Sequence, residues 1–167
     1  NCLSYKINTQ TYFIDVDLDL PIISLVTGPS NLWDDETGIY VLGNNASPEP
    51  PYFVANSRED WEKPVHIEFF ESNETLAFKH DAGIKIFGGW SRMKPQKSLA
   101  IFARSIYGSD AINYKIFSTK TIDSFQAIVL RNSGQDNNLS MIRDGLMTGL
   151  MDDTGIDHQA YRASVVY

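Results

Sequence analysis

Positively charged side chains gather in one segment of an otherwise acidic sequence. Residues 83–101, GIKIFGGWSRMKPQKSLAI, carry Arg92 and Lys97 after a Gly88-Gly89 pair, whereas the whole chain has a formal net charge of -7. Glycines permit backbone conformations that leave N–H groups free for an anion, and arginine offers a planar fork to phosphate or carboxylate. The segment therefore fits a compact anion, although a hairpin tip with lysines can also be a plain solvated surface.

A Walker A phosphate loop is excluded for this segment. Lys97-Ser98 resembles the final Lys-Ser of that motif, but Ser91 and Gln96 stand where its two glycines are required. The pattern that begins at Ser98 favours a strand, whereas a Walker A loop leads into a helix. We expect any anion held here to lie in a strand-loop-strand hairpin.

A second group of polar side chains follows an apolar run near residue 130. Arg131 and Asn132 open the stretch RNSGQD, and Arg143-Asp144 follow on a predicted helix. A strand end that feeds polar residues into a cleft is a common ligand site. The alternative is a polar loop with an exposed Arg-Asp pair, which would contribute well under about 1 kcal/mol. Adjacent helical residues point about 100° apart, so Arg143 and Asp144 should not both face one cleft squarely.

Other reactive residue types show no catalytic or metal-binding spacing. His66, His80 and His158 are scattered, which favours structural or exposed roles over metal ligation. Ser91 and Ser133 lie outside any G-x-S-x-G elbow, which argues against a serine hydrolase.

The acidic run DVDLDL at residues 15–20 leaves two alternatives open. Aspartates at alternate positions are typical of a calcium loop, but Leu20 stands where an EF-hand needs Gly and Val26 where it needs Glu. A solvated linker is the favoured interpretation.

Composition bounds the class of protein. The 167 residues predict about one domain, and 43% hydrophobic residues are typical of a folded chain. A sequence pI near 4.8 argues against general nucleic-acid binding, which needs net positive faces. No apolar run reaches the length of a membrane span, so none is expected.

The two ends of the sequence predict an excised piece. The chain lacks an initiator Met, and its apolar end at residues 163–167 resembles an interrupted strand. We therefore expect it to stop inside its own domain. The single Cys2 does not distinguish between cytoplasm and exterior.

Hydrophobic patterns predict an α+β fold, a mainly antiparallel twisted sheet packed on one principal helix. The helix is expected over 139–151, where apolar residues recur at helical spacing. One helical turn is expected over 30–33, capped by Ser30 or Asn31. Strands are expected over 4–14, 22–27, 38–42, 64–71, 75–79, 83–87, from Ser98 onward, 124–131 and 160–167.

Four blocks of the sequence together resemble the CotH-type spore-coat protein kinase family. They are LPIISLVTGPSNLWDDETGIYV, PVHIEFFE, the segment GIKIFGGWSRMKPQKSLAI, and IVLRNSGQD followed by MIRDGL, at residues 20–41, 64–71, 83–101, 128–136 and 141–146. The resemblance implies an atypical protein-kinase-like fold that binds ATP with Mg or Mn. It also implies transfer of phosphate to serine or threonine of secreted or surface proteins, and hence an extracellular or cell-surface location in bacteria.

The resemblance assigns roles to the basic segment. It implies that Gly88, Gly89, Ser91 and Arg92 lie over the nucleotide and that Lys97 contacts phosphate. It places the metal-binding and catalytic aspartates beyond Tyr167. Because phosphoryl transfer depends on metal-assisted charge stabilisation, the fragment itself is expected to be inactive.

The second polar group and the chain ends also receive assignments. Arg131, Asn132, Arg143 and Asp144 would line or brace the nucleotide cleft. Residues 1–14 are similar to the last strand of a chitobiase C-terminal or Fn3-like module, so residues 15–167 would be the N-terminal portion of the kinase domain. The alternative function is a non-catalytic, surface-attached binding or structural module with the same fold.

Overall fold

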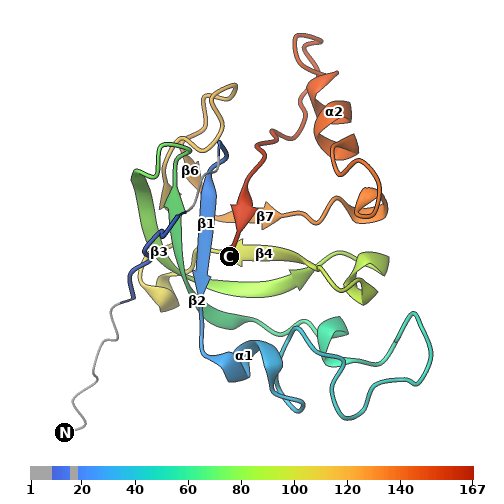
Figure 1. The fold of residues 1–167 in the computed structure, drawn as a ribbon. Coiled ribbons are helices and arrows are strands. Elements are labelled where there is room, and N and C mark those ends of the chain that lie inside the picture. Colours follow the sequence, from blue (N-terminus) through green and yellow to red (C-terminus); the bar gives the residue numbers. More distant parts are fainter. Residues whose placement is uncertain (1–8, 16–18) are drawn as a thin grey trace, which may run out of the picture.

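A strongly curved sheet forms the centre of the protein (Figure 1). The computed structural model describes residues 9–15 and 19–167. Within these ranges, six strands pair in the order β7-β4-β3-β2-β1-β8, and β5 and β6 form a separate ribbon. Neighbours in the large sheet are antiparallel except β1 and β8. The strands are β1 Ile22–Val26, β2 Lys63–Phe70, β3 Leu76–Phe87, β4 Ser98–Phe102, β5 Ile112–Asn113, β6 Ser124–Phe125, β7 Ala127–Leu130 and β8 Val165–Val166.

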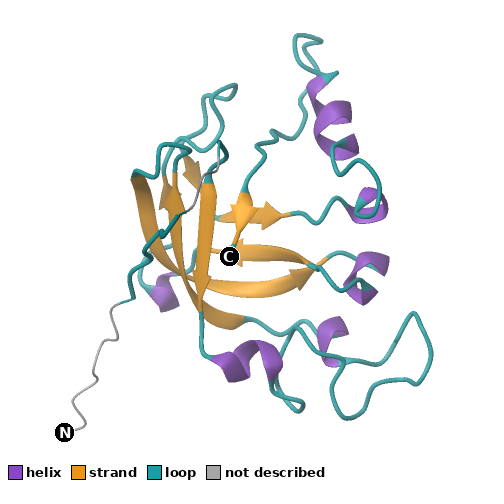
Figure 2. Cartoon of the chain, in the orientation of Figure 1, coloured by secondary structure: helices purple, strands orange, loops and turns teal. Residues whose placement is uncertain are grey.

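Helices are short and lie at the margins of the sheet (Figure 2). The α-helices are α1 Pro29–Trp33 and α2 Arg143–Gly149, and the 3-10 helices are η1 Asn56–Arg58, η2 Trp90–Met93, η3 Ser105–Tyr107 and η4 Gly134–Asp136. In the part of the chain that the structure describes, no helix has the length and apolar character to cross a membrane. The α+β class, with its mainly antiparallel sheet, is confirmed.

One face of the sheet carries the hydrophobic core. Alternate residues of β2 and β3 point into it, among them Ile67, Ile84 and Ile86, and Ile101 joins them from β4. The segment after α1 covers this face through Ile39, which is 1% exposed. The alternation predicted for 64–71 is therefore confirmed.

The opposite face is covered over β1 and β2 by residues 9–14. The backbone N–H of Thr11 donates to Glu68 Oε2 at 2.8 Å, and the Phe13 ring meets Phe70 edge-on at 4.7 Å. Glu68 is only 2% exposed as a result. The strand expected over 4–14 lies partly outside the described residues, and residues 9–14 run as irregular extended chain.

Several predicted strands differ from the structure. Residues 76–79 and 83–87 belong to the single strand β3, because pairing with β2 and β4 continues through Gly83. Residues 38–42 form no strand, since Ile39 and Tyr40 donate instead to carbonyls of the α1 segment. The segment 124–131 is divided into β6 and β7 and is only half buried, because β7 is an edge strand. The predicted helical turn over 30–33 is confirmed, but Gly28 rather than Ser30 or Asn31 occupies its N-cap.

The expected principal helix is shorter than predicted and does not pack on the sheet. Residue Met141 has φ +60°, so the helix begins only at Arg143. Its apolar residues Leu146, Met147 and Leu150 are 56–63% exposed. Figure 1 shows α2 extending away from the strands. The core face is covered instead by the segment that follows α1, which the sequence pattern did not indicate.

Candidate functional site

The glycine pair forms a tight turn between β3 and η2. Gly88 has φ +105°, a conformation that favours glycine, and a Cβ there would lie 2.4 Å from Ser91 Oγ. Gly89 is open, because a Cβ added to it would meet no atom within 4 Å. The turn therefore exposes backbone that a side chain would otherwise cover, as the sequence pattern indicated.

The facing wall comes from the end of β7 and the start of α2. Ser133 has φ +63° and Gly134 φ +54°, so the chain turns sharply after β7. Asn132, which is 2% exposed, fixes this turn: its Oδ1 accepts from Ser98 Oγ at 2.8 Å and from Gly134 N at 3.0 Å. This buried amide ties the end of β7 to the start of β4.

A cleft of about 330 Å³ lies between the glycine turn and this wall. It is open to solvent and is lined by Gly88, Gly89, Trp90, Ser91, Arg131, Ser133, Gly134, Gln135, Asp136, Arg143 and Asp144. The two polar groups of the sequence thus meet at one place, although they lie far apart along the chain. Arg143 and Asp144, the first two residues of α2, both line the cleft.

Arginine–carboxylate pairs set the charge of the cleft. Arg131 donates through Nε and Nη2 to Asp144 Oδ2 at 2.7 and 2.6 Å. Arg143 Nη2 lies 3.4 Å from Asp136 Oδ1. The Ser140 hydroxyl, the backbone N–H groups of Arg143 and Ser140 and the Arg143 charge lower the pKa of Asp136 despite the opposing effect of burial. Both pairs are neutral overall, so an anion must compete with a carboxylate for each guanidinium.

Arg92 lies beside the cleft and binds backbone carbonyl groups. Its Nε donates to Gly88 O at 2.6 Å, and its Nη1 donates to Arg58 O at 2.9 Å and approaches Ser57 O at 3.4 Å. The guanidinium therefore joins η1 to the glycine turn. It lies outside the cleft lining but lines a neighbouring hollow.

Lys97 also lies outside the cleft lining. The side chain is buried, its Nζ donates to Lys94 O at 2.7 Å, and it stands 5.3 Å from the centroid of the Tyr40 ring. Burial, with a smaller effect of the nearby Arg58 charge, lowers the pKa of Lys97. A direct contact between Lys97 and phosphate stays a prediction, and it would require the ammonium group to leave Lys94 O.

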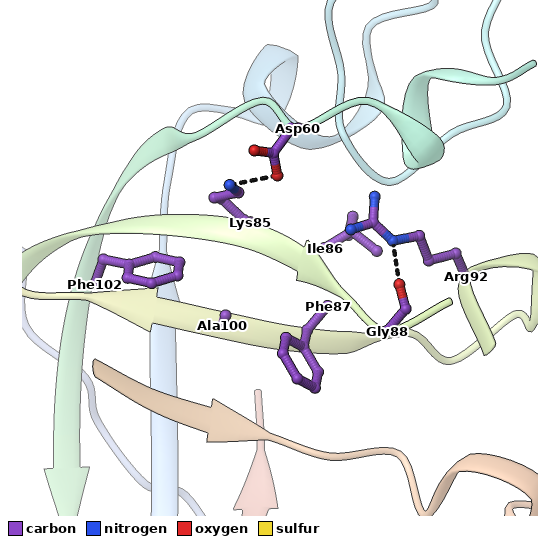
Figure 3. Close-up of a pocket in the computed structure, with 8 residues that line it drawn as sticks. All are labelled: Asp60, Lys85, Ile86, Phe87, Gly88, Arg92, Ala100 and Phe102. Atoms are coloured by element: carbon purple, nitrogen blue, oxygen red, sulfur yellow. Dashed lines mark hydrogen bonds and ion pairs between the residues drawn. The ribbon is translucent and has the colours of Figure 1, made fainter. Parts of the chain in front are cut away.

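A second hollow of about 450 Å³ lies on the other side of the glycine turn, and the two hollows share Gly88. Figure 3 shows Ala100 on its floor between the rings of Phe87 and Phe102, and Lys85 reaching toward Asp60. Lys85 forms an ion pair with Asp60, which lowers the pKa of that carboxyl. The hollow thus combines an apolar floor with one charged edge.

Six of the residues that line the cleft were predicted from the sequence as site residues, and others were not. Gly88, Gly89, Ser91, Arg131, Arg143 and Asp144 meet in it, whereas Arg92, Lys97 and Asn132 brace its walls from outside. The chief residue missed is Asp136, which belonged to the polar stretch RNSGQD but received no role. The only sequence signal for its pairing with Arg143 is that the two residues have opposite charge and lie seven positions apart.

The segment that contains both walls matches a known family. Residues 84–167, half of the chain, match the family model described as CotH kinase protein. The chain belongs to the CotH kinase protein family. No curated protein and no solved structure matches it. The resemblance inferred from the sequence is confirmed, and every cleft residue lies inside the CotH match.

A metal is implied by this CotH membership, and the described residues do not supply a site for it. They contain no group of three or more His, Cys, Asp or Glu side chains placed to hold a metal ion. The two cleft carboxylates, Asp136 and Asp144, already face arginines.

Proposed function

We propose that the cleft binds the polyphosphate of ATP. The protein would be the nucleotide-binding portion of a CotH-like atypical kinase that transfers phosphate to serine or threonine of secreted or surface bacterial proteins. The observation that carries the proposal is the meeting of the glycine turn with Arg131 and Arg143 in one cleft inside the matched segment. Backbone N–H groups of a tight turn and arginine forks are both suited to phosphate oxygens.

Arg143 is the cation best placed for the ligand. Its side chain is 58% exposed, and its contact with Asp136 is long at 3.4 Å. Arg131 is 45% exposed and bonds more closely to Asp144. Exposed ion pairs contribute about 0–1 kcal/mol, so a multiply charged phosphate can displace Asp144 at small cost. We expect polyphosphates to bind more tightly than single phosphates for this reason.

The second hollow is suited to the base of the nucleotide. Its floor at Ala100 is flanked by Phe87 and Phe102, which offer apolar faces to a planar ring. Because the hollow shares Gly88 with the cleft, a single nucleotide could cross the glycine turn with its base on one side and its phosphates on the other.

The described residues would bind and orient the nucleotide. Mg or Mn, which the family implies, would supply charge neutralisation when ATP is bound, but the described residues provide no site for it. The arginines and turn N–H groups would hold the phosphate chain in place. Each arginine of the cleft already faces a carboxylate. This observation favours a second candidate function, that of a surface-attached module that keeps the CotH fold without catalysis.

Calorimetric titration with ATP, with and without Mg²⁺, tests the proposal. We expect Arg143→Gln and Arg131→Gln each to weaken binding about tenfold, which is the loss of one charge-assisted contact. Lys115→Gln removes the same charge at an exposed position outside both hollows and should leave the affinity unchanged. Absence of heat with the unsubstituted protein, or equal weakening in the Lys115 variant, would refute the proposal.

A separate variant tests whether the second hollow holds the base of the nucleotide. Phe87→Ala should weaken ATP binding while leaving tripolyphosphate binding unchanged, because tripolyphosphate has no base. Equal effects on both ligands would show that the second hollow does not hold the base.

A further inference from the structure

One buried carboxylate fixes the position of Arg143. Asp136 is 2% exposed. Its Oδ2 accepts from Ser140 Oγ at 2.7 Å and from the Arg143 backbone N–H at 3.1 Å. Its Oδ1 accepts from the Ser140 backbone N–H at 3.4 Å and faces the Arg143 guanidinium at the same distance. A single side chain therefore holds both the backbone and the side chain of Arg143.

The local backbone explains why this arrangement is needed. Met141 has φ +60°, and the N-cap residue Ile142 makes no side-chain cap hydrogen bond. The first N–H groups of a helix have no partner within the helix. Asp136, seven residues earlier, supplies the acceptor for the Arg143 N–H and so determines where α2 starts.

The negative charge of Asp136 is unfavourable for an anion site unless neighbouring groups neutralise it. A carboxylate in the wall of the cleft repels phosphate. Here its oxygens accept two backbone N–H groups and a hydroxyl, and they face a guanidinium. For Arg143, Asp136 is the only ion-pair partner among the residues described. Among the described residues, this contact is what holds the exposed Arg143 side chain at the wall of the cleft.

We propose that Asp136 is a positioning residue that presents Arg143 to the phosphates of the ligand. The inference rests on the proposed function, because it assigns Asp136 an effect on phosphate affinity. The change in affinity should be opposite to that expected from charge alone: removal of the negative charge of Asp136 should weaken the binding of phosphate.

A double-mutant cycle with ATP tests this role. We expect Asp136→Asn to weaken ATP binding about fivefold and Arg143→Gln about tenfold, whereas the double variant should be no weaker than Arg143→Gln alone, because residues that act through one contact are not additive. Asp136→Asn combined with Arg131→Gln should instead show multiplied effects. Multiplied effects in the Arg143 cycle, or tighter ATP binding by Asp136→Asn, would overturn the proposal.

A second readout does not depend on nucleotide. Amide hydrogen exchange at Arg143 should be at least about tenfold faster in Asp136→Asn, because the N–H loses its charged acceptor. Unchanged exchange would overturn the positioning role even if ATP binds. If the unsubstituted protein binds no ATP, the proposed function fails, and the exchange result still decides whether Asp136 fixes Arg143.

A milder variant covers the case in which Asp136→Asn does not fold. Ser140→Ala removes only the hydroxyl that donates to Asp136 Oδ2. We expect it to speed exchange at Arg143 and to weaken ATP binding about threefold. Ser109→Ala, which removes a hydroxyl from an exposed loop, is the matched control and should change neither. Equal behaviour of the two variants would overturn the proposal.

Discussion

Replacement of Lys97 separates a role in folding from a role in phosphate binding. The ammonium group donates to Lys94 O at 2.7 Å and lies against the Tyr40 ring, and the residue is 9% exposed. In this position the side chain holds the loop after η2 from inside. We therefore expect Lys97→Ala to lower stability more than affinity.

The magnitude follows from the contacts that are lost. A hydrogen bond from a charged group contributes about 1.5–3 kcal/mol, and a cation–π contact about 0.5–2 kcal/mol. Burial of the ammonium, which lowers the pKa of Lys97, opposes these gains. We expect a net loss of about 2 kcal/mol, which lowers the Tm of a protein of this size by about 4–8 °C.

The assay combines thermal unfolding with ATP titration. Lys94→Ala is the matched control, because its side chain makes no hydrogen bond or ion pair among the described residues and its carbonyl, which accepts from Lys97, is kept. We expect Lys97→Ala to lose stability with less than about a threefold change in ATP affinity, and Lys94→Ala to change neither. A normal Tm with an affinity about tenfold or more weaker would refute this reasoning and would support Lys97 as the phosphate contact.

Three further outcomes follow from the packing of the C-terminal segment. Gly145→Ala should gain less stability than Gly149→Ala, because its Cβ would lie 2.5 Å from the ring of Tyr161, a half-exposed side chain that would have to move; Gly149→Ala meets nothing and should gain up to about 1 kcal/mol from helix propensity. Arg162→Ala should cost about 2–3 kcal/mol in chemical denaturation, because its guanidinium bonds Glu71 and the carbonyl of residue 116. The Arg162 hydrogen bond is the main cause of a lowered pKa of Glu71. The Glu71–Arg162 pair should therefore stabilise the fold fully above the unfolded-state Glu pKa of about 4.3. Its contribution should be lost as pH falls through the lower pKa of Glu71 in the folded protein. A Gly145 variant as stable as the Gly149 variant, or an unchanged acid limb in Arg162→Ala, would contradict these assignments.

Local patterns were sufficient for some of the strands and for the residue types in the two walls of the cleft. Alternation identified β2, and the glycine pair identified the turn that Gly88 makes with φ +105°. These features depend on the period of side chains along a strand and on backbone sterics, both of which can be read from neighbouring residues.

Features that depend on contacts between distant residues could not be read in this way. The apolar spacing over 139–151 predicted a long helix, but Asp136 and the left-handed Met141 delay its start. The sequence did not show that Arg92 and Lys97 both donate to carbonyl oxygens of neighbouring loops. A long cationic side chain can bury its stem and reach a backbone acceptor, and sequence does not distinguish that from an exposed cation.

The position of bound phosphate decides whether the glycine turn and the two arginines form the ligand site. Backbone and arginine side-chain NMR signals of the labelled protein would be followed during titration with ATP and, separately, with tripolyphosphate. We expect both ligands to shift the amides of Gly88, Gly89 and Ser91 and the side-chain signals of Arg131 and Arg143. Shifts confined to other parts of the sheet, or no shifts with either ligand, would contradict this assignment.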